Sequence, residues 1–298
     1  MDSTIWSKYW KDAHINCFGD EKENYSGTLK SNWYDFFHKI QPNNSILDLC
    51  CGNGSLESLF KEYNESLYKS TKIVGVDYAD LLIPEDIKAD KNVSFKIGTN
   101  IEKLPFEDNS FDVLISNFGV EYSNLEDSIS EMIRVLKPLG RVQFISHVKE
   151  SRLIAKSNEI QHMLDEFLSE SSLFHTFQLL VKNLIVEDKN SSEHYRNLLN
   201  EWLNIFVNKY GEIFLEFGFI DFIRHILSNL NPKALEAMSL YEKDIILYNQ
   251  RLVAMVSSAV IEEEFLQKFS KIGLKSIRSK IIKDFYNNSI ALMSDFVK

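Results

Sequence analysis

Cysteine is scarce in this chain of 298 residues: there are three in all, and two of them, Cys50 and Cys51, are adjacent. This spacing matches no metal-ligand pattern, and it does not suit a disulfide framework. We therefore expect free thiols, no metal site and a cytoplasmic protein.

Positive charge is also in short supply, because 33 Lys and Arg residues are set against 43 Asp and Glu and leave a formal net charge of −10. Proteins that bind nucleic acid normally present a basic face to the phosphates. The charge balance therefore disfavours a nucleic-acid partner, although it leaves room for a local basic patch.

Long apolar runs are missing as well. No stretch approaches the roughly 18 apolar residues that a membrane-spanning helix needs. The first six residues, Met1-Asp2-Ser3-Thr4-Ile5-Trp6, lack the basic head and the apolar run of a signal peptide. We expect neither a membrane span nor a signal peptide. With 44% hydrophobic and 26% charged residues, the composition is that of a globular protein.

The most informative segment is residues 46–54, with the sequence ILDLCCGNG. A short apolar strand runs into a glycine-bearing turn, and Ser55 stands where it can cap the following helix. Such a turn lets a polar group of a ligand approach bare backbone amides. A second apolar run ends at Asp77, and an acidic residue at the tip of the next parallel strand is suited to binding ribose hydroxyls.

Short apolar runs alternate with amphipathic stretches from residue 45 to residue 148. They predict strands at 45–49, 72–76, 93–97, 111–116 and 141–148, and helices near 55–64 and 123–136, the second ending at Lys137-Pro138-Leu139-Gly140. This alternation is typical of a parallel sheet with helices on both faces. Ligands of such sheets bind at the carboxyl ends of the strands, where the strand order reverses.

The remaining segments differ in character. Residues 1–44 are rich in aromatic residues and are expected to be helical in pieces, and residues 151–258 keep a helical period without any β signal. Further helices are predicted near 212–229, 233–246 and 247–271, and the tail, 259–298, returns with a last helix and strands at 275–282 and 289–297. We predict an α/β fold: a doubly wound, mostly parallel seven-stranded sheet with a large all-helical insertion between the fifth strand and the final strand pair.

The order of these motifs resembles the class I methyltransferases that use S-adenosylmethionine, specifically their small-molecule branch. Besides the glycine turn and Asp77, the resemblance is carried by Leu104-Pro105-Phe106 with Ser110-Phe111-Asp112-Val113, and by Arg134-Val135-Leu136-Lys137-Pro138-Leu139-Gly140. It covers roughly residues 45–148 and returns at 259–298. The chain departs from the family pattern at Cys50 and Leu139, where glycines are usual.

The resemblance implies which residues bind S-adenosylmethionine. Asp48 would meet its amine, Asp77 its ribose hydroxyls, and amides of the turn its carboxylate. The other implied cofactor-binding residues are Cys50, Gly52 and Gly54 in the turn, Tyr78 and Ile101 against the adenine, Asn100 at the adenine amino group, Asn117 in the pocket wall and Tyr25 near the methionine end. The plainer alternatives are that Asp48 only caps the loop and that Asp77 only ends a strand.

Such a protein needs few catalytic groups. The sulfonium of the cofactor is a good leaving group, so alignment of the acceptor with the methyl group supplies most of the acceleration. Two residues at strand ends are candidates for a general base: His147 after the fifth strand and Glu121 after the fourth. The plainer alternatives are a hydrogen-bonded structural histidine and a helix-start or solvent-facing glutamate.

The resemblance also suggests that residues 1–44 form a lid over a core at 45–150, and that residues 151–258 form a cap over the methyl acceptor. Aromatic and histidine side chains of the insertion are candidates for an apolar pocket wall or simply for its core: Phe174, His175, Phe177, Trp202, Phe206, Tyr210, Phe214 and Phe217.

We predict an S-adenosylmethionine-dependent methyltransferase that acts on a small, partly hydrophobic or glycan-like metabolite and can form a homodimer through the helical insertion. One alternative is an RNA or protein methyltransferase, which should show a basic rim, and another is a non-catalytic, cofactor-binding regulatory protein. A nicotinamide dehydrogenase fits poorly, because Glu57 stands where its fingerprint has a third glycine.

Overall fold

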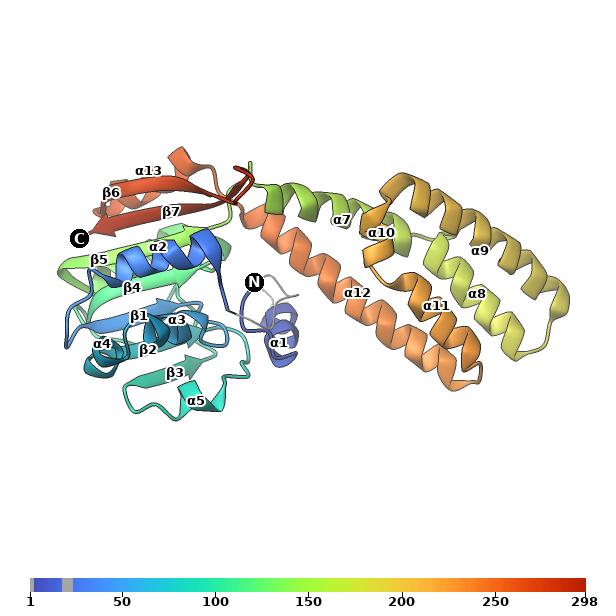
Figure 1. Ribbon diagram of the computed structural model, residues 1–298, viewed down its shortest axis with the longest axis horizontal. Coiled ribbons are helices and arrows are strands. Elements are labelled where there is room, and N and C mark those ends of the chain that lie inside the picture. The colour runs from blue at the N-terminus through green and yellow to red at the C-terminus, as the bar shows by residue number, and fades with distance from the viewer. Residues whose placement is uncertain (1–2, 18–23) are drawn as a thin grey trace. The chain divides into compact units, whose positions relative to one another are not determined.

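The computed structural model describes residues 3–17 and 24–298. A seven-stranded sheet organises the chain, with the strand order β3-β2-β1-β4-β5-β7-β6 (Figure 1). The strands are β1 (Ser45–Leu49), β2 (Lys72–Asp77), β3 (Val93–Ile97), β4 (Phe111–Asn117), β5 (Leu136–Ser146), β6 (Lys275–Lys283) and β7 (Ser289–Val297). Strands β1 to β5 pair in parallel, and β7 pairs antiparallel with both β5 and β6. The predicted mostly parallel α/β sheet is confirmed, and its strand order reverses between β1 and β4.

Helices cover both faces of this sheet, which explains why its central strands are apolar on both sides. The helices around it are α1 (Ser3–Lys11), α2 (Gly27–Phe37), α3 (Ser55–Tyr63), α4 (Glu65–Ser70), α5 (Glu85–Lys88), α6 (Leu125–Val135), α13 (Glu262–Ile272) and the 3-10 turn η1 (Val120–Tyr122). Trp33 of α2 and Phe60 of α3 pack in one core cluster with Ile46. Met132 of α6 and Phe269 of α13 belong to a second cluster.

Residues Lys156–Val253 form a second compact unit, which is entirely helical. The helices that build it, wholly or in large part, are α7 (Arg152–Leu168), α8 (Leu173–Ile185), α9 (Lys189–Tyr210), α10 (Glu212–Glu216), α11 (Phe219–Ser228) and α12 (Lys233–Ser258). Packed rings make its core: the centroids of Phe222 and Tyr241 are 3.9 Å apart, and those of Phe167 and Phe219 are 4.7 Å apart. Among the described residues, no helix is both long and apolar enough to cross a membrane.

The aromatic side chains proposed for a pocket wall in the insertion fall into two groups. Four are fully buried in the ring core of this unit: Phe174, Phe177, Phe206 and Phe214. Trp202, Tyr210 and Phe217 are half-buried and contact that core, whereas His175 is exposed. The helical spacing of these rings therefore reflects the packing of the unit itself.

The fifth strand differs from its prediction at both ends. It begins at Leu136, which pairs with Phe111, and the next pair is Val113 with Arg141, so the intervening residues form a bulge. Leu139 adopts a positive φ of 64° there, and its N–H donates to the carbonyl of Lys298 at 3.2 Å. Pairing with neighbouring strands thus draws the segment that was predicted only to end the preceding helix into β5.

Two helix boundaries were also wrong. The predicted break near residue 246 is absent, because α12 continues to Ser258, and the chain breaks where Val260 donates to the carbonyl of His147 at 2.8 Å. The helix predicted over 212–229 is split into α10 and α11 at Gly218, whose φ is 77°. Tertiary pairing ends α12, and a glycine with left-handed backbone separates α10 from α11. The spacing of apolar residues in the sequence indicates neither boundary.

Candidate functional site

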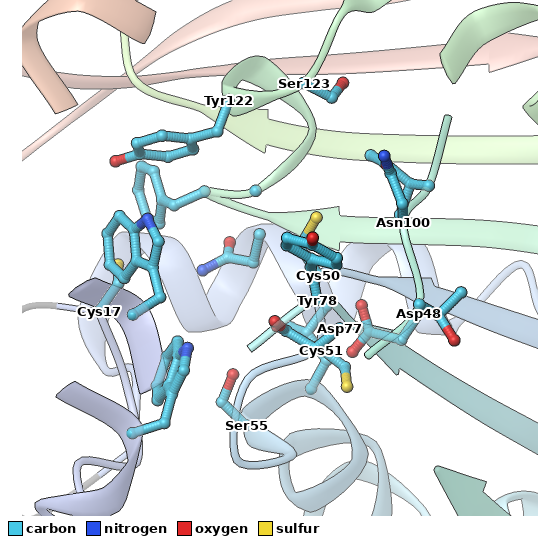
Figure 2. Close-up of a pocket in the computed structure, with 18 of the residues that line it drawn as sticks. Cys17, Asp48, Cys50, Cys51, Ser55, Asp77, Tyr78, Asn100, Tyr122 and Ser123 are labelled. Atoms are coloured by element: carbon cyan, nitrogen blue, oxygen red, sulfur yellow. The ribbon is translucent and has the colours of Figure 1, made fainter. Parts of the chain in front are cut away.

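A cavity of about 180 Å³ lies at the carboxyl ends of β1, β2 and β4, where the strand order reverses (Figure 2). The lining residues include Trp6, Trp10, Cys17 and Tyr25 from the N-terminal segment, Asp48 from β1, Cys50 and Cys51 from the glycine turn, Ser55 at the start of α3, Asp77 at the end of β2 with Tyr78 after it, residues 99–102 after β3, and Asn117 at the end of β4 with Phe118, Gly119, Tyr122 and Ser123 after it. This is the position at which ligands bind in doubly wound sheets. Eight of the ten predicted cofactor-binding residues, from five separate segments, therefore meet around one cavity, and Gly52 and Gly54 do not line it.

Left-handed backbone shapes the glycine turn. Cys50, Gly52 and Gly54 have φ values of 58°, 52° and 86°. Gly54, and not Ser55 as predicted, is the N-cap of α3, and Ser55 begins the helix and lines the cavity. A side chain at Gly52 would meet the ring of Trp10 at 2.6 Å, so a bare backbone is required there for Trp10 to pack on the turn.

The backbone amide of Gly52 is already engaged, which departs from the expectation of free amides in the turn. It donates to Oδ2 of Asp77 at 2.9 Å. Neither Gly52 nor Gly54 is among the residues that line the cavity. The structure therefore uses these two glycines to shape the turn and leaves Cys50, Cys51 and Ser55 facing the cavity.

Asp77 lines the cavity at the end of β2 and is 8% exposed. Its Oδ1 accepts from the amide of Ala79 at 2.8 Å, and its Oδ2 accepts from Gly52. Burial raises the pKa of Asp77 to about 6. Each carboxylate oxygen has a second lone pair, so Asp77 can hold the turn and still accept from two ligand hydroxyls.

Asp48 at the end of β1 is 1% exposed, lines the cavity, and has no hydrogen-bond partner for either carboxylate oxygen among the described residues. Burial, and next the negative charge of Glu57 beside it, raise the pKa of Asp48 well above its usual range. An orphaned buried carboxylate is costly. Its position on the cavity wall suits a ligand that carries a cationic group.

The cavity also carries the residues expected against an adenine ring. Ile101 is buried, and Tyr78 is half-exposed at 51%. Oδ1 of Asn100 accepts from the amide of Glu102 at 2.9 Å, so the oxygen expected to meet the adenine amino group is partly used in a local turn. Oε1 of Glu102 in turn accepts from the amide of Asn124 at 2.8 Å, which ties the loops after β3 and β4 together.

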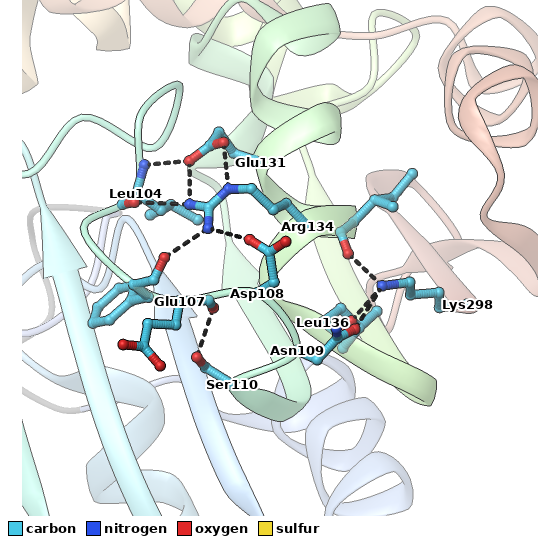
Figure 3. Close-up of polar contacts among 11 residues, drawn as sticks. Leu104, Glu107, Asp108, Asn109, Ser110, Glu131, Arg134, Leu136 and Lys298 are labelled. Atoms are coloured by element: carbon cyan, nitrogen blue, oxygen red, sulfur yellow. Dashed lines mark hydrogen bonds and ion pairs between the residues drawn. The ribbon is translucent and has the colours of Figure 1, made fainter.

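The forked guanidinium group of Arg134 holds the segment that follows Ile101 and Glu102 (Figure 3). The guanidinium of Arg134 on α6 donates to the carbonyls of Leu104 at 2.9 Å and Phe106 at 2.6 Å, and to both carboxylate oxygens of Glu131. Oε2 of Glu131 also accepts from the amide of Leu104 at 2.7 Å. The pair Arg134–Glu131 therefore positions the loop whose first residues line the cavity.

The N-terminal segment is fastened over the turn by a residue that sequence reasoning missed. Nδ2 of Asn53 donates to the carbonyls of Trp10 and His14, both at 2.8 Å, and its Oδ1 accepts from the amide of Leu82 at 2.8 Å. The only hint in the sequence is a polar residue between two glycines. The ring of Trp6 also meets Tyr122 edge-on at 5.2 Å, and both residues line the cavity.

Tyr25 and Asn117 both reach the cavity. The Tyr25 hydroxyl donates to Sγ of Cys17 at 3.3 Å, and burial raises its pKa well above the usual range. Oδ1 of Asn117 accepts from Nε1 of Trp33 at 2.9 Å. This contact orients the amide of Asn117 and leaves its nitrogen as the group that can donate to a ligand.

The two candidate bases are not among the residues that line the cavity. His147 is 2% exposed, and its ring stacks on Phe118 with centroids 4.5 Å apart. Burial lowers the pKa of His147 to about 3, so the ring is neutral at physiological pH. Its backbone amide donates to Oε1 of Glu121 at 2.8 Å, and burial raises the pKa of Glu121 to about 7. Their role as a base stays a prediction.

A family model described as a methyltransferase domain matches residues 40–204, more than half of the chain. This chain belongs to that family. The match confirms the resemblance to the class I S-adenosylmethionine-dependent methyltransferases, which are enzymes with S-adenosylmethionine as their cofactor.

Curated relatives match the chain in part. It is 40% identical over 108 residues to a demethylmenaquinone methyltransferase of Lactococcus lactis, covering 33% of this chain and 40% of the relative. It is 34% identical over 142 residues to a ubiquinone/menaquinone biosynthesis C-methyltransferase of Ectopseudomonas mendocina, covering 44% of this chain and 54% of the relative. The chain thus spans about half the length of these relatives.

Among solved structures, the chain is similar to a 1,6-didemethyltoxoflavin-N1-methyltransferase of Burkholderia thailandensis, crystallised with 1,6-didemethyltoxoflavin and S-adenosylhomocysteine. The TM-score is 0.50 at 10% identity, and the match covers 99% of this chain and 86% of the other. At this identity the likeness concerns the fold alone.

Proposed function

We propose that this chain transfers the methyl group of S-adenosylmethionine to a small, partly hydrophobic metabolite. The proposal rests on one observation: two acidic residues at the ends of neighbouring strands line the same cavity. Asp48 is an orphaned buried carboxylate there, and Asp77 keeps free lone pairs there. The first suits an ammonium group and the second suits the two hydroxyls of a ribose, and the cofactor carries both.

The remaining walls fit the rest of the cofactor. Tyr78 and Ile101 offer a ring and an apolar surface to the adenine, and Asn100 lies beside them. Tyr25 and Asn117 line the cavity together with Cys17 and would lie toward the methionine end. When bound, S-adenosylmethionine supplies a methyl group on a sulfonium, which is a good leaving group.

The chain's own contribution to the reaction would be positioning. Trp6, Trp10 and Tyr122 line the cavity with aromatic rings, which would limit access of water to a bound ligand. Well-oriented reactants gain about 7–11 kcal/mol in the best cases. With no candidate base on the cavity wall, we propose that alignment of the acceptor carries most of the acceleration.

The acceptor would be small and without strong negative charge. Among the described lining residues the charged side chains are Asp48, Asp77 and Glu102, and none is Lys or Arg. Such a wall does not suit the phosphates of an RNA. The methyltransferase names of the relatives support a small-molecule acceptor.

Calorimetric titration with S-adenosylhomocysteine tests the proposal. We expect Asp77→Ala to lose charged hydrogen bonds of about 1.5–3 kcal/mol, which is a fall in affinity of about 10- to 150-fold. Asp86→Ala, an exposed acidic residue on α5, is the matched control and should bind as the wild type does. Equal binding by Asp77→Ala, or no binding by the wild type, would contradict the proposal.

A further inference from the structure

Glu57, in the first turn of α3, is a second buried carboxylate behind the cavity wall. It is 1% exposed, and both its oxygens lack a hydrogen-bond partner among the described residues. It does not line the cavity, but it lies next to Asp48, which does. A carboxylate that is buried, unpaired and beside another acid is a costly feature unless it has a use.

Among the described residues, the titratable groups that act on this pair carry no positive charge. Asp77 approaches from β2, and the thiols of Cys50 and Cys51 belong to the turn between β1 and α3. No Lys or Arg in the described part of the chain donates a hydrogen bond to Asp48 or Glu57. Two adjacent buried carboxylates without a cation cannot both stay ionised, so they hold a proton between them.

We propose that Glu57 is a positioning residue for the cofactor: it shares a proton with Asp48 in the free protein, and the pair releases this proton to solvent when the cofactor's ammonium group binds Asp48. The inference rests on the proposed function. The step breaks one carboxyl O–H bond and forms an ion pair between the ammonium and Asp48, so charge and atoms balance. Glu57 acts through Asp48 and does not touch the ligand.

Calorimetry in buffers of different ionisation enthalpy counts the released protons. At pH 7 we expect S-adenosylhomocysteine to release close to one proton per molecule bound. 5′-Methylthioadenosine, which has the same adenosine but no amino-acid group, should bind without release. Equal proton counts for the two ligands would overturn the inference. If neither ligand binds, the proposed function itself is contradicted. Binding with equal proton counts contradicts only the role of Glu57, so the two results can be told apart.

Glu57→Gln separates this role from a merely structural one. In the wild type we expect the affinity for S-adenosylhomocysteine to rise with pH between 6 and 8, by up to about tenfold per unit while one proton is released. In Glu57→Gln the amide donates to Asp48 and removes the repulsion, so the rise should shift to lower pH and the proton count should fall.

Glu62→Gln, at an exposed position on the same helix, is the matched control and should keep the wild-type pH profile. An unchanged profile and proton count in Glu57→Gln would contradict the role of Glu57. The comparison of the two ligands on the wild type tests the inference even where a variant is poorly folded.

Discussion

At the scale of single residues, burial decides which side chains are available for chemistry. Asp48 and His147 are almost equally buried, at 1% and 2% exposure, yet only Asp48 lines the cavity. His147 lies behind Phe118, which does line it. A residue at a strand end thus faces the ligand or the core according to the loop that packs over it.

The burial of His147 leads to a direct test. Because desolvation disfavours the charged imidazolium and lowers its pKa to about 3, we expect no titration of this ring between pH 5 and pH 8. An NMR pH titration of the imidazole signals, with His147→Gln to assign the resonance, measures it. A midpoint between pH 6 and pH 7 would show a solvent-accessible ring and would revive its role as a base.

At the scale of elements, loops after parallel strands carry the site, and contacts from helices hold those loops. Asn53 binds the N-terminal segment to the glycine turn through two hydrogen bonds, and a third joins the turn to Leu82 after β2. Arg134 does the same for the loop after β3. The two anchors lie at positions that no apolar period marks, because each is defined by backbone carbonyls of distant segments.

Arg134→Gln tests the second anchor. The planar fork that reaches two carbonyls and Glu131 cannot be reproduced by a glutamine, so we expect the free energy of unfolding to fall by about 2 kcal/mol. The affinity for S-adenosylhomocysteine should fall several-fold as well, because the loop after β3 loosens. Thermal unfolding and calorimetry measure the two effects.

Arg196→Gln is the control for this prediction, because Arg196 forms an exposed pair with Glu193 at the same spacing on α9. Exposed pairs contribute little, so this variant should unfold and bind as the wild type does. If Arg134→Gln also behaved as the wild type, the fork would have no positioning role.

At the scale of the whole molecule, buried acids set the response to pH. Burial raises the pKa of Asp77 to about 6 and those of Glu57 and Glu121 to about 7, and the pKa of Asp48 rises too. A group whose pKa is higher in the folded state keeps a proton that the unfolded chain loses. Its contribution to stability is therefore present at low pH and is lost as pH rises through the folded-state pKa.

We therefore expect the ligand-free protein to unfold at a lower temperature at pH 8 than at pH 5.5. Burial of His147 makes stability rise with pH, because its pKa is lowered, but this is one group and the four buried acids act in the other direction. The shift of Glu121 from its usual 4.5 to about 7 corresponds to about 3 kcal/mol, so Glu121→Gln should flatten the profile. A wild-type melting temperature that rises from pH 5.5 to pH 8 would contradict this.

The sequence by itself determined the fold class and the edge of the sheet at which the candidate site lies. Strands β1 and β3 have the predicted bounds, and Asp48 and Asp77 meet at one cavity as expected. These features follow from local chemistry, namely apolar runs of strand length, glycines that permit left-handed backbone, and the rule that parallel strands end at one edge.

Only the tertiary structure decided which neighbours each residue meets. Pairing with β4 and with Lys298 drew residues 136–140 into β5, and the bridge to Val148 ended α12 before Val260. The same kind of contact placed Glu57 beside Asp48 and His147 behind Phe118. Such long-range contacts depend on how distant segments pack, and a local pattern of residue types carries no record of them.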